Sequence, residues 1–273
     1  MATQDTRPSP GELTERGRIV WSSGDFNEIA RQTMMVAEDL VRMADPRPGH
    51  HVLDVACGSG NLALIAARRS CEVVGIDIAE NLIERARTRA AAEGSTSDFR
   101  TGDAQALPCK DNSFDIVASV FGVIFAPDQA RAAHELVRVC RSGGTVARAN
   151  WMPEGFGGAF FGAHARHAPP PPGSPSPLRW GTEAGLEELL GDGVRELHCT
   201  RRSGFAYYPS VTQAVELFAR YFGPTIRARE VVGAQGEADL KRDIAAVFEQ
   251  FNRADDGTAV IETEYLQVRA TRA

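Results

Sequence analysis

The sequence is poor in the residues that build metal sites and disulfide frameworks. It has five cysteines in 273 residues, spread from Cys57 to Cys199, and no two are spaced as C-x-x-C. An odd, scattered set of this kind is typical neither of a zinc site nor of a disulfide-stapled fold. We therefore expect no metal centre, and cysteines that are small residues in a reducing cytoplasm.

Long apolar runs and an excess of positive charge are also missing. No stretch approaches the roughly 20 apolar residues of a membrane-spanning helix, and the N-terminus has no apolar segment typical of a secretory signal. The formal charge is −6, from 30 basic and 36 acidic residues, whereas nucleic-acid binders usually carry a basic excess. These absences predict a cytoplasmic protein without membrane or nucleic-acid partners, and they leave a homodimer open.

What is present is an ordinary globular composition with a regular alternation of strands and helices. Hydrophobic residues make up 43% of the chain, which is enough for one large core. The predicted strands are 51–56, 71–77, 97–101, 114–121 and 145–151. The helices predicted between them are 61–69, 79–93 and 128–140. Such alternation predicts an α/β fold of parallel βαβ units with right-handed crossovers.

Composition also divides the chain into segments. We expect a flexible tail over residues 1–12 and a core over 13–151 that begins with a helical cap. Residues 152–180 are rich in Gly and Pro and predict a stiff, extended lid insert. Residues 181–273 would complete the core with its last two strands and a helical insert near 209–256.

The segment VLDVACGSGN joins the first predicted strand to the first helix of the alternation. Glycines in such a turn let a ligand approach the backbone, and the free N–H groups of the helix N-terminus point to the same place. Asp77 ends the next strand, where a carboxylate suits ribose hydroxyls. The letters from Gly58 to Ala63 also satisfy G-x-G-x-x-A, so NAD(P) and S-adenosylmethionine both stay open. Asp54, just before the turn, favours S-adenosylmethionine, because its carboxylate would repel the pyrophosphate of NAD(P) and attract the ammonium of S-adenosylmethionine.

Five elements together resemble the class I S-adenosylmethionine-dependent methyltransferases, of the bacterial small-molecule type related to quinone-biosynthesis enzymes. They are VLDVACGSG, GID, GDAQALP, FDIV and the RSGG turn. The resemblance implies a Rossmann-like sheet of seven strands, all parallel but the last, with helices on both faces and inserts that form a lid over the active site. It also implies a cofactor site with three parts. The methionine part would be surrounded by Asp54, Ala56, Gly58, Ser59 and Gly60, with Ser119 near the reacting methyl. The ribose and adenine would contact Asp77, Ile78, Asp103 and Ala104.

Some residues have no fixed role in this pattern. His164 and His167 lie in the insert expected over the cofactor, so each is a candidate general base. Arg148 lies in a strand expected to be buried, so it needs a partner or a cavity. Nine aromatic residues would make an apolar acceptor pocket if they face the site. They are Trp21, Phe26, Phe121, Phe125, Trp151, Phe156, Phe160, Phe161 and Trp180.

The sequence therefore predicts a methyltransferase of bacterial secondary metabolism. It would move the methyl group of S-adenosylmethionine to an O, N or C atom of a small, apolar or aromatic acceptor, leaving S-adenosylhomocysteine. Alignment and exclusion of water can supply much of the catalysis for so strong an electrophile. Two alternatives remain: a protein of this fold that binds S-adenosylmethionine and acts as a non-methylating cyclase, and an NAD(P)-dependent oxidoreductase.

Overall fold

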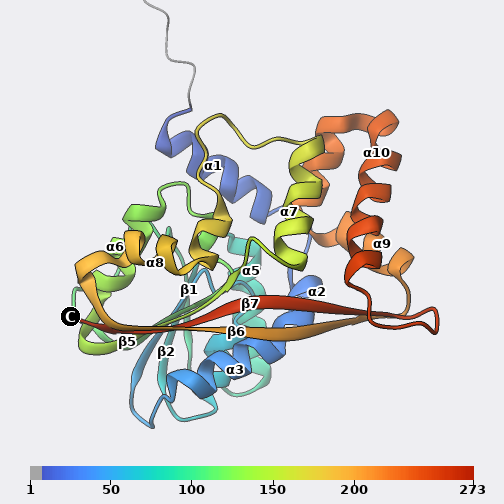
Figure 1. Cartoon of the computed structure of the whole chain (residues 1–273). Coiled ribbons are helices and arrows are strands. Elements are labelled where there is room, and N and C mark those ends of the chain that lie inside the picture. The colour runs from blue at the N-terminus through green and yellow to red at the C-terminus, as the bar shows by residue number, and fades with distance from the viewer. Residues whose placement is uncertain (1–7) are drawn as a thin grey trace, which may run out of the picture.

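A computed structural model describes residues 8–273, which build one seven-stranded sheet in the order β3-β2-β1-β4-β5-β7-β6 (Figure 1). The strands are β1 His51–Val55, β2 Glu72–Asp77, β3 Asp98–Thr101, β4 Phe114–Val120, β5 Cys140–Trp151, β6 Val194–Tyr208 and β7 Ala259–Arg272. β7 runs antiparallel to both of its neighbours, β5 and β6, and the other neighbouring strands of the sheet are parallel to each other. The fold class predicted from the sequence is confirmed.

Helices cover both faces of the sheet because the central strands are apolar on both sides. Val52 and Ile116 face a core formed with one set of helices, and Leu53 and Val117 face a core formed with the other. The first set is α3 Met34–Ala44, α4 Asn61–Ala67 and α5 Glu80–Ala92. The second set is η2 Val123–Phe125, α6 Gln129–Val139, η3 Pro177–Gly181, α8 Glu183–Leu190 and η4 Gly191–Gly193. Both cores run the width of the parallel part of the sheet.

A third core lies beyond the parallel strands, where the long β6 and β7 extend past the rest of the sheet (Figure 1). Its helices are α2 Asn27–Ala30, α7 Phe156–His167, α9 Val211–Tyr221 and α10 Gly223–Phe251, with α1 Pro10–Trp21 and η1 Arg31–Thr33 beside them. Phenylalanines dominate this core, and Phe248 and Phe160 lie at its centre with rings 6.1 Å apart. No helix among residues 8–273 is both long and apolar enough to cross a bilayer.

The structure corrects several predicted segments. The tail was expected to reach residue 12, but α1 already begins at Pro10 with a Ser9 capping box; residues 1–7 lie outside the described part. The insert 152–180 is not extended throughout, because α7 occupies Phe156–His167. β5 begins at Cys140, so it includes residues 141–144, the RSGG segment that was expected to form a turn before the strand. Within residues 209–256, where a helical insert was expected, lie α9 and α10; α10 starts at Gly223 and is broken at Gly233, where φ is 64°.

Candidate active site

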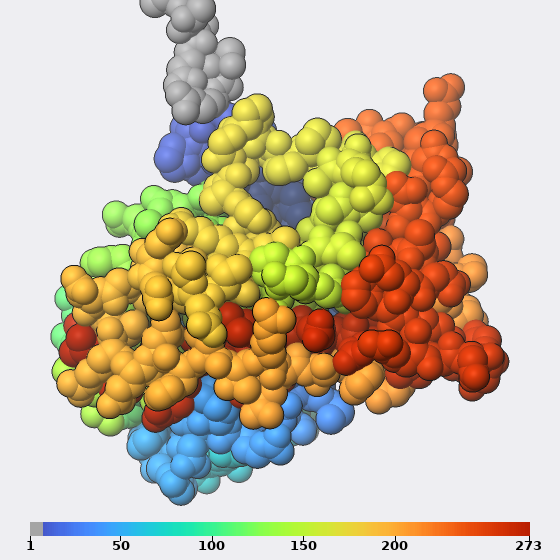
Figure 2. Space-filling view, viewed as in Figure 1, coloured from blue at the N-terminus to red at the C-terminus, as the bar shows by residue number. Residues whose placement is uncertain are grey.

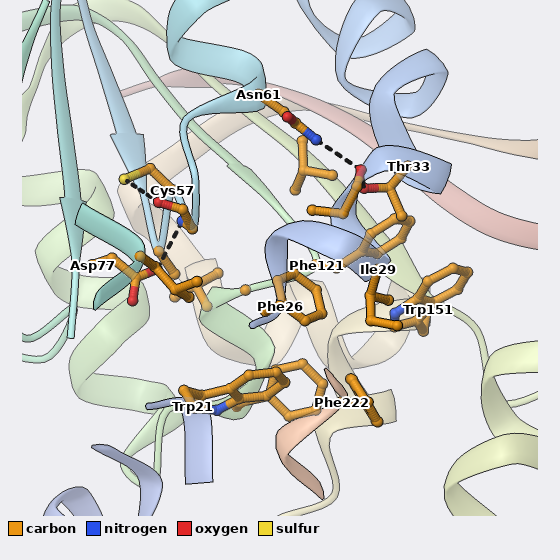
Figure 3. A pocket seen from close by; sticks show the side chains of 18 of the residues that line it. Trp21, Phe26, Ile29, Thr33, Cys57, Asn61, Asp77, Phe121, Trp151 and Phe222 are labelled. Carbon is orange, nitrogen blue, oxygen red and sulfur yellow. Dashed lines mark hydrogen bonds between the residues drawn. The ribbon is translucent and has the colours of Figure 1, made fainter. Parts of the chain in front are cut away.

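A pocket lies at the carboxyl ends of β1, β2, β3 and β4 (Figure 3). Eight of the ten residues predicted to bind the cofactor line it, and they come from the ends of three neighbouring strands. They are Asp54, Ala56, Gly58, Ser59, Asp77, Ile78, Asp103 and Ala104. Parallel strands bring their carboxyl ends to one edge of a sheet, which is where open α/β sheets bind ligands.

The turn between β1 and α4 has the backbone that its glycines predict. Gly58 and Gly60 both have positive φ, 55° and 84°, and Gly60 is the N-cap residue of α4. The N–H of Gly58 donates to Oδ2 of Asp77 over 2.8 Å, which joins this turn to the end of β2. From behind, Arg89 of α5 donates to the backbone oxygen of Ser59 over 2.6 Å and to Oδ1 of Asn61 over 2.7 Å. The conformation of the turn is thus fixed by hydrogen bonds to side chains of β2 and α5.

Three carboxylates line the pocket at successive strand ends, and the first two are buried. Asp54 is 2% exposed and its Oδ2 accepts the Ala63 N–H over 3.0 Å. Burial raises the pKa of Asp54 to about 8, because no cation of the chain lies beside it and Asp77 adds repulsion. Burial also raises the pKa of Asp77, against the N–H groups of Ala79 and Gly58 that favour its charged form. A cationic ligand group at Asp54 would remove this penalty.

The third carboxylate, Asp103, connects the pocket to the N-terminal segment. Its Oδ1 accepts hydrogen bonds from the backbone N–H and the side-chain amide of Gln105. The same amide donates to Oγ1 of Thr14 in α1 over 2.9 Å. Arg85 of α5 pairs with Asp25 at 2.6 Å, so α1 is fastened to the loop after β3 and the residues after α1 are fastened to α5. The N-terminal segment therefore covers the cofactor side of the pocket.

The other half of the pocket is aromatic. Eight of the nine aromatic residues singled out in the sequence line it, and Trp180 is the exception. Trp21 lies 4.8 Å from Phe125, and Phe121 stacks on Trp151 with centroids 3.8 Å apart. Phe222, the residue directly before α10, packs edge-to-face against Trp21, with the ring centroids 5.9 Å apart (Figure 3). Among the described residues that line the pocket there is no Lys, Arg, His or Glu.

Four predicted site residues are not on the pocket wall. His164 is 8% exposed and bonds through its two ring nitrogens to the Phe160 carbonyl and to Oγ1 of Thr225. His167 pairs with Asp243 of α10 at 3.0 Å. The structure thus turns both histidines toward α10, away from the place expected for a general base. Ser119 is fully buried and its hydroxyl accepts the Val123 N–H, while Gly60 shapes the turn from inside.

Apart from Trp21 and Phe26, sequence reasoning missed the residues that reach the pocket from the chain's first 33 positions. Thr14, Gly17 and Trp21 line it from one face of α1, and Gln32 and Thr33 line it from η1. The spacing of Thr14, Gly17 and Trp21 is helical, but no residue of α1 is buried, so the usual apolar stripe is absent. Figure 2 shows a hollow between α7 and the residues before α8, with the N-terminal helix at its floor.

The pocket fits a ligand that carries a cation, ribose hydroxyls and a flat base. Asp54 would face the cation, Asp77 the hydroxyls and Asp103 a ring amino group, with Ile78 and Leu82 supplying apolar contact. No group of three or more metal-ligating side chains occurs among residues 8–273. The three buried or half-buried carboxylates, with no cation of the chain among the pocket's described lining residues, point to a ligand that brings its own positive charge.

Comparisons with known proteins agree with this geometry. A family model described as "Methyltransferase domain" matches residues 52–144. The uncharacterised protein Rv1405c of Mycobacterium tuberculosis is 39% identical over 265 residues, which cover 95% of both chains. Methyltransferase GfsG of Streptomyces halstedii is 37% identical over 133 residues, 48% of each chain.

Solved structures are similar in fold. A putative methyltransferase from Bacillus halodurans has a TM-score of 0.59 at 22% identity, covering 86% of this chain and 97% of that one. The [4+2]-cyclase SpnF has a TM-score of 0.60 at 17% identity, covering 97% of both. The glycine turn alone left two cofactors open. S-adenosylmethionine is favoured over NAD(P) by the fold, the strand-end carboxylates and the matched methyltransferase domain. This chain belongs to the class I S-adenosylmethionine-dependent methyltransferases.

Proposed function

We propose that this methyltransferase acts on a small, apolar or aromatic metabolite that carries no permanent charge. The observation that supports this most strongly is the pocket itself, which runs from the three strand-end carboxylates into a compartment walled by aromatic side chains. Because no Lys, Arg or His lines its described part, a phosphate or carboxylate on the acceptor would be buried without a counter-charge. The proposed acceptor is therefore neutral apart from its reacting atom.

Two carboxylates would hold the methyl donor in place. Asp54 would accept its ammonium, with Oδ2 already fixed by the Ala63 N–H. Asp77 would accept hydrogen bonds from the ribose hydroxyls of the donor. The hydrogen bonds that Asp77 receives from the N–H groups of Gly58 and Ala79 orient its carboxylate for that role. S-adenosylmethionine supplies a methyl group on a positively charged sulfur, which becomes a neutral thioether as the carbon–sulfur bond breaks and the acceptor gains the methyl.

The aromatic residues would align the acceptor and exclude water. Trp21 and Phe125 lie in contact on one side, and Phe121 and Trp151 stack on another, so a flat acceptor would be held between rigid rings. Such alignment alone can supply a large part of the barrier reduction for an in-line transfer. The only phenol on the wall is Tyr208, whose pKa burial raises, so it stays a neutral hydrogen-bond donor. The acceptor's proton would then be lost to water before or after transfer.

The test is methyl transfer from S-adenosylmethionine with a deuterated methyl group, offered with a panel of neutral phenols, quinols, enolisable ketones and aromatic amines. We expect one class to gain the labelled methyl while an equal amount of S-adenosylhomocysteine forms. The fold is shared with a protein titled a [4+2]-cyclase, and the same assay separates the two activities. A cyclase would convert its substrate without consuming S-adenosylmethionine, which would refute the proposal.

A further inference from the structure

Arg148 is a buried arginine in the middle of the sheet, away from the pocket. It lies on β5, paired in register with Ser119 of β4 and Val268 of β7, and it is 1% exposed. Its side chain points to the face covered by η3, where its Cζ lies 3.7 Å from the centre of the Trp180 ring. The side chains of Trp180 and Asn150 are themselves fully buried. This arginine is therefore enclosed by protein on every side.

Among residues 8–273 the guanidinium has no acidic partner. Its Nη2 donates to Oδ1 of Asn150 over 2.8 Å, and its Nε and Nη1 donate to no protein atom. Burial lowers the pKa of Arg148, and no acidic group acts against that effect. Glu135, the buried glutamate of α6 on this face of the sheet, is already engaged by Arg138 and the Leu107 N–H. Arginine keeps its proton in proteins, so a full positive charge lies in the core with the face of the Trp180 ring beside it and no carboxylate of residues 8–273 to pair with.

The neighbouring unpartnered groups are donors as well. Asn150, two residues along the same face of β5, has its Nδ2 without an acceptor, and Trp180 has its Nε1 without one. With Nε and Nη1 of Arg148 this makes four buried donor atoms around one positive charge. One water molecule accepts only about two hydrogen bonds and brings no charge, so it leaves two of the four donors and the positive charge unsatisfied.

We propose that Arg148, Asn150 and Trp180 bind a small monovalent inorganic anion of about the size of chloride. An anion of this kind cancels the charge and accepts several hydrogen bonds at once. An organic carboxylate is excluded by enclosure, since the three side chains are at most 1% exposed. The site is independent of the methyl-transfer pocket, because none of the three residues lines it. It would stabilise β5 directly behind the wall that carries Trp151.

The first test measures thermal unfolding in sodium chloride against sodium gluconate at constant ionic strength. We expect chloride to raise the Tm of the wild type in a saturable way, by roughly 5 °C once chloride exceeds its Kd about 100-fold. Arg148→Met should abolish that rise. Arg141→Met removes an exposed arginine from the same strand and alters the net charge equally, so it should keep the rise. An equal chloride response in all three proteins would overturn the proposal.

The second test needs no variant. Crystals of the wild type grown or soaked in bromide should show an anomalous peak within hydrogen-bond distance of Arg148 Nε or Nη1. Bromide on the surface alone, with no peak at Arg148, would equally overturn the proposal, whatever the folding of Arg148→Met. The proposed methyl transfer would stand in either case, since it rests on other residues.

Discussion

Without cofactor, Asp54→Asn should be more stable than the wild type, and the difference in stability should grow as the pH rises. This is expected although the substitution removes a residue placed at the cofactor. Asp54 has a pKa of about 8 in the folded chain, against an ordinary value of 3.8. The folded state therefore holds a proton that the unfolded state releases between these two values. Stability from this group is present below about pH 4 and is lost as the pH rises toward 8.

The size of the effect follows from the shift. Each pH unit between the two pKa values takes about 1.4 kcal/mol from the wild type, while Asn is neutral throughout and can still accept the Ala63 N–H. From pH 5 to pH 7 the variant should therefore gain about 3 kcal/mol relative to the wild type. In Tm this corresponds to roughly 5 to 10 °C for a chain of this size. Above pH 8 the difference should stop growing.

The assay is thermal unfolding of both proteins without cofactor, from pH 5 to pH 9. Asp98→Asn is the matched control, because it removes the same charge from an exposed position on β3 and should give a pH dependence parallel to the wild type. Parallel curves for wild type and Asp54→Asn would refute the reasoning, since the buried carboxyl would then titrate normally.

Further predictions concern cofactor binding, the packing of the site and its histidines. S-adenosylhomocysteine should bind the wild type more tightly as the pH rises toward 8, with release of a proton, seen by calorimetry in two buffers of different ionisation enthalpy; a buffer-independent heat would contradict this. Gly122→Ala should cost about 1–3 kcal/mol, because its Cβ would lie 2.6 Å from the Ala56 carbonyl oxygen; denaturant unfolding measures the loss. His164→Ala should lower stability by about 1–3 kcal/mol yet leave the pH profile of kcat unchanged, because its nitrogens bond to Phe160 and Thr225. A profile that loses its acidic limb, the fall in kcat at low pH, would restore that histidine as a base.

The parallel part of the fold and its carboxylates were predictable because each is specified locally. Short apolar runs define β1 to β4, helical segments separate β1, β2 and β3, and Asp77 is the last residue of its strand. Thr182 stands directly before the helical run of α8, and its hydroxyl accepts the Gly185 N–H as an N-cap residue should. These features depend on neighbours within a few residues in the chain.

Features that depend on distant packing were not predictable. The glycines of α7 belong to an insert that was predicted to be extended, but Gly158 is required in a helix here because a Cβ there would meet the Pro153 oxygen at 1.8 Å. Without that helix, the direction of His164 and His167 toward α10 could not be foreseen. Thr14 and Gly17 reach the pocket from a helix in which no residue is buried, so their role appears only once the chain is folded.

The most direct test of the account is calorimetric titration of the wild type and Asp77→Ala with S-adenosylhomocysteine. Asp77 links the glycine turn to the ribose position, and it is placed by two backbone N–H groups. We predict one binding site per chain in the wild type and a loss of affinity of about 100-fold in the variant, as for a lost charge-assisted pair of hydrogen bonds. A wild type that does not bind, or a variant that binds equally well, would contradict the assignment of this pocket to the methyl donor.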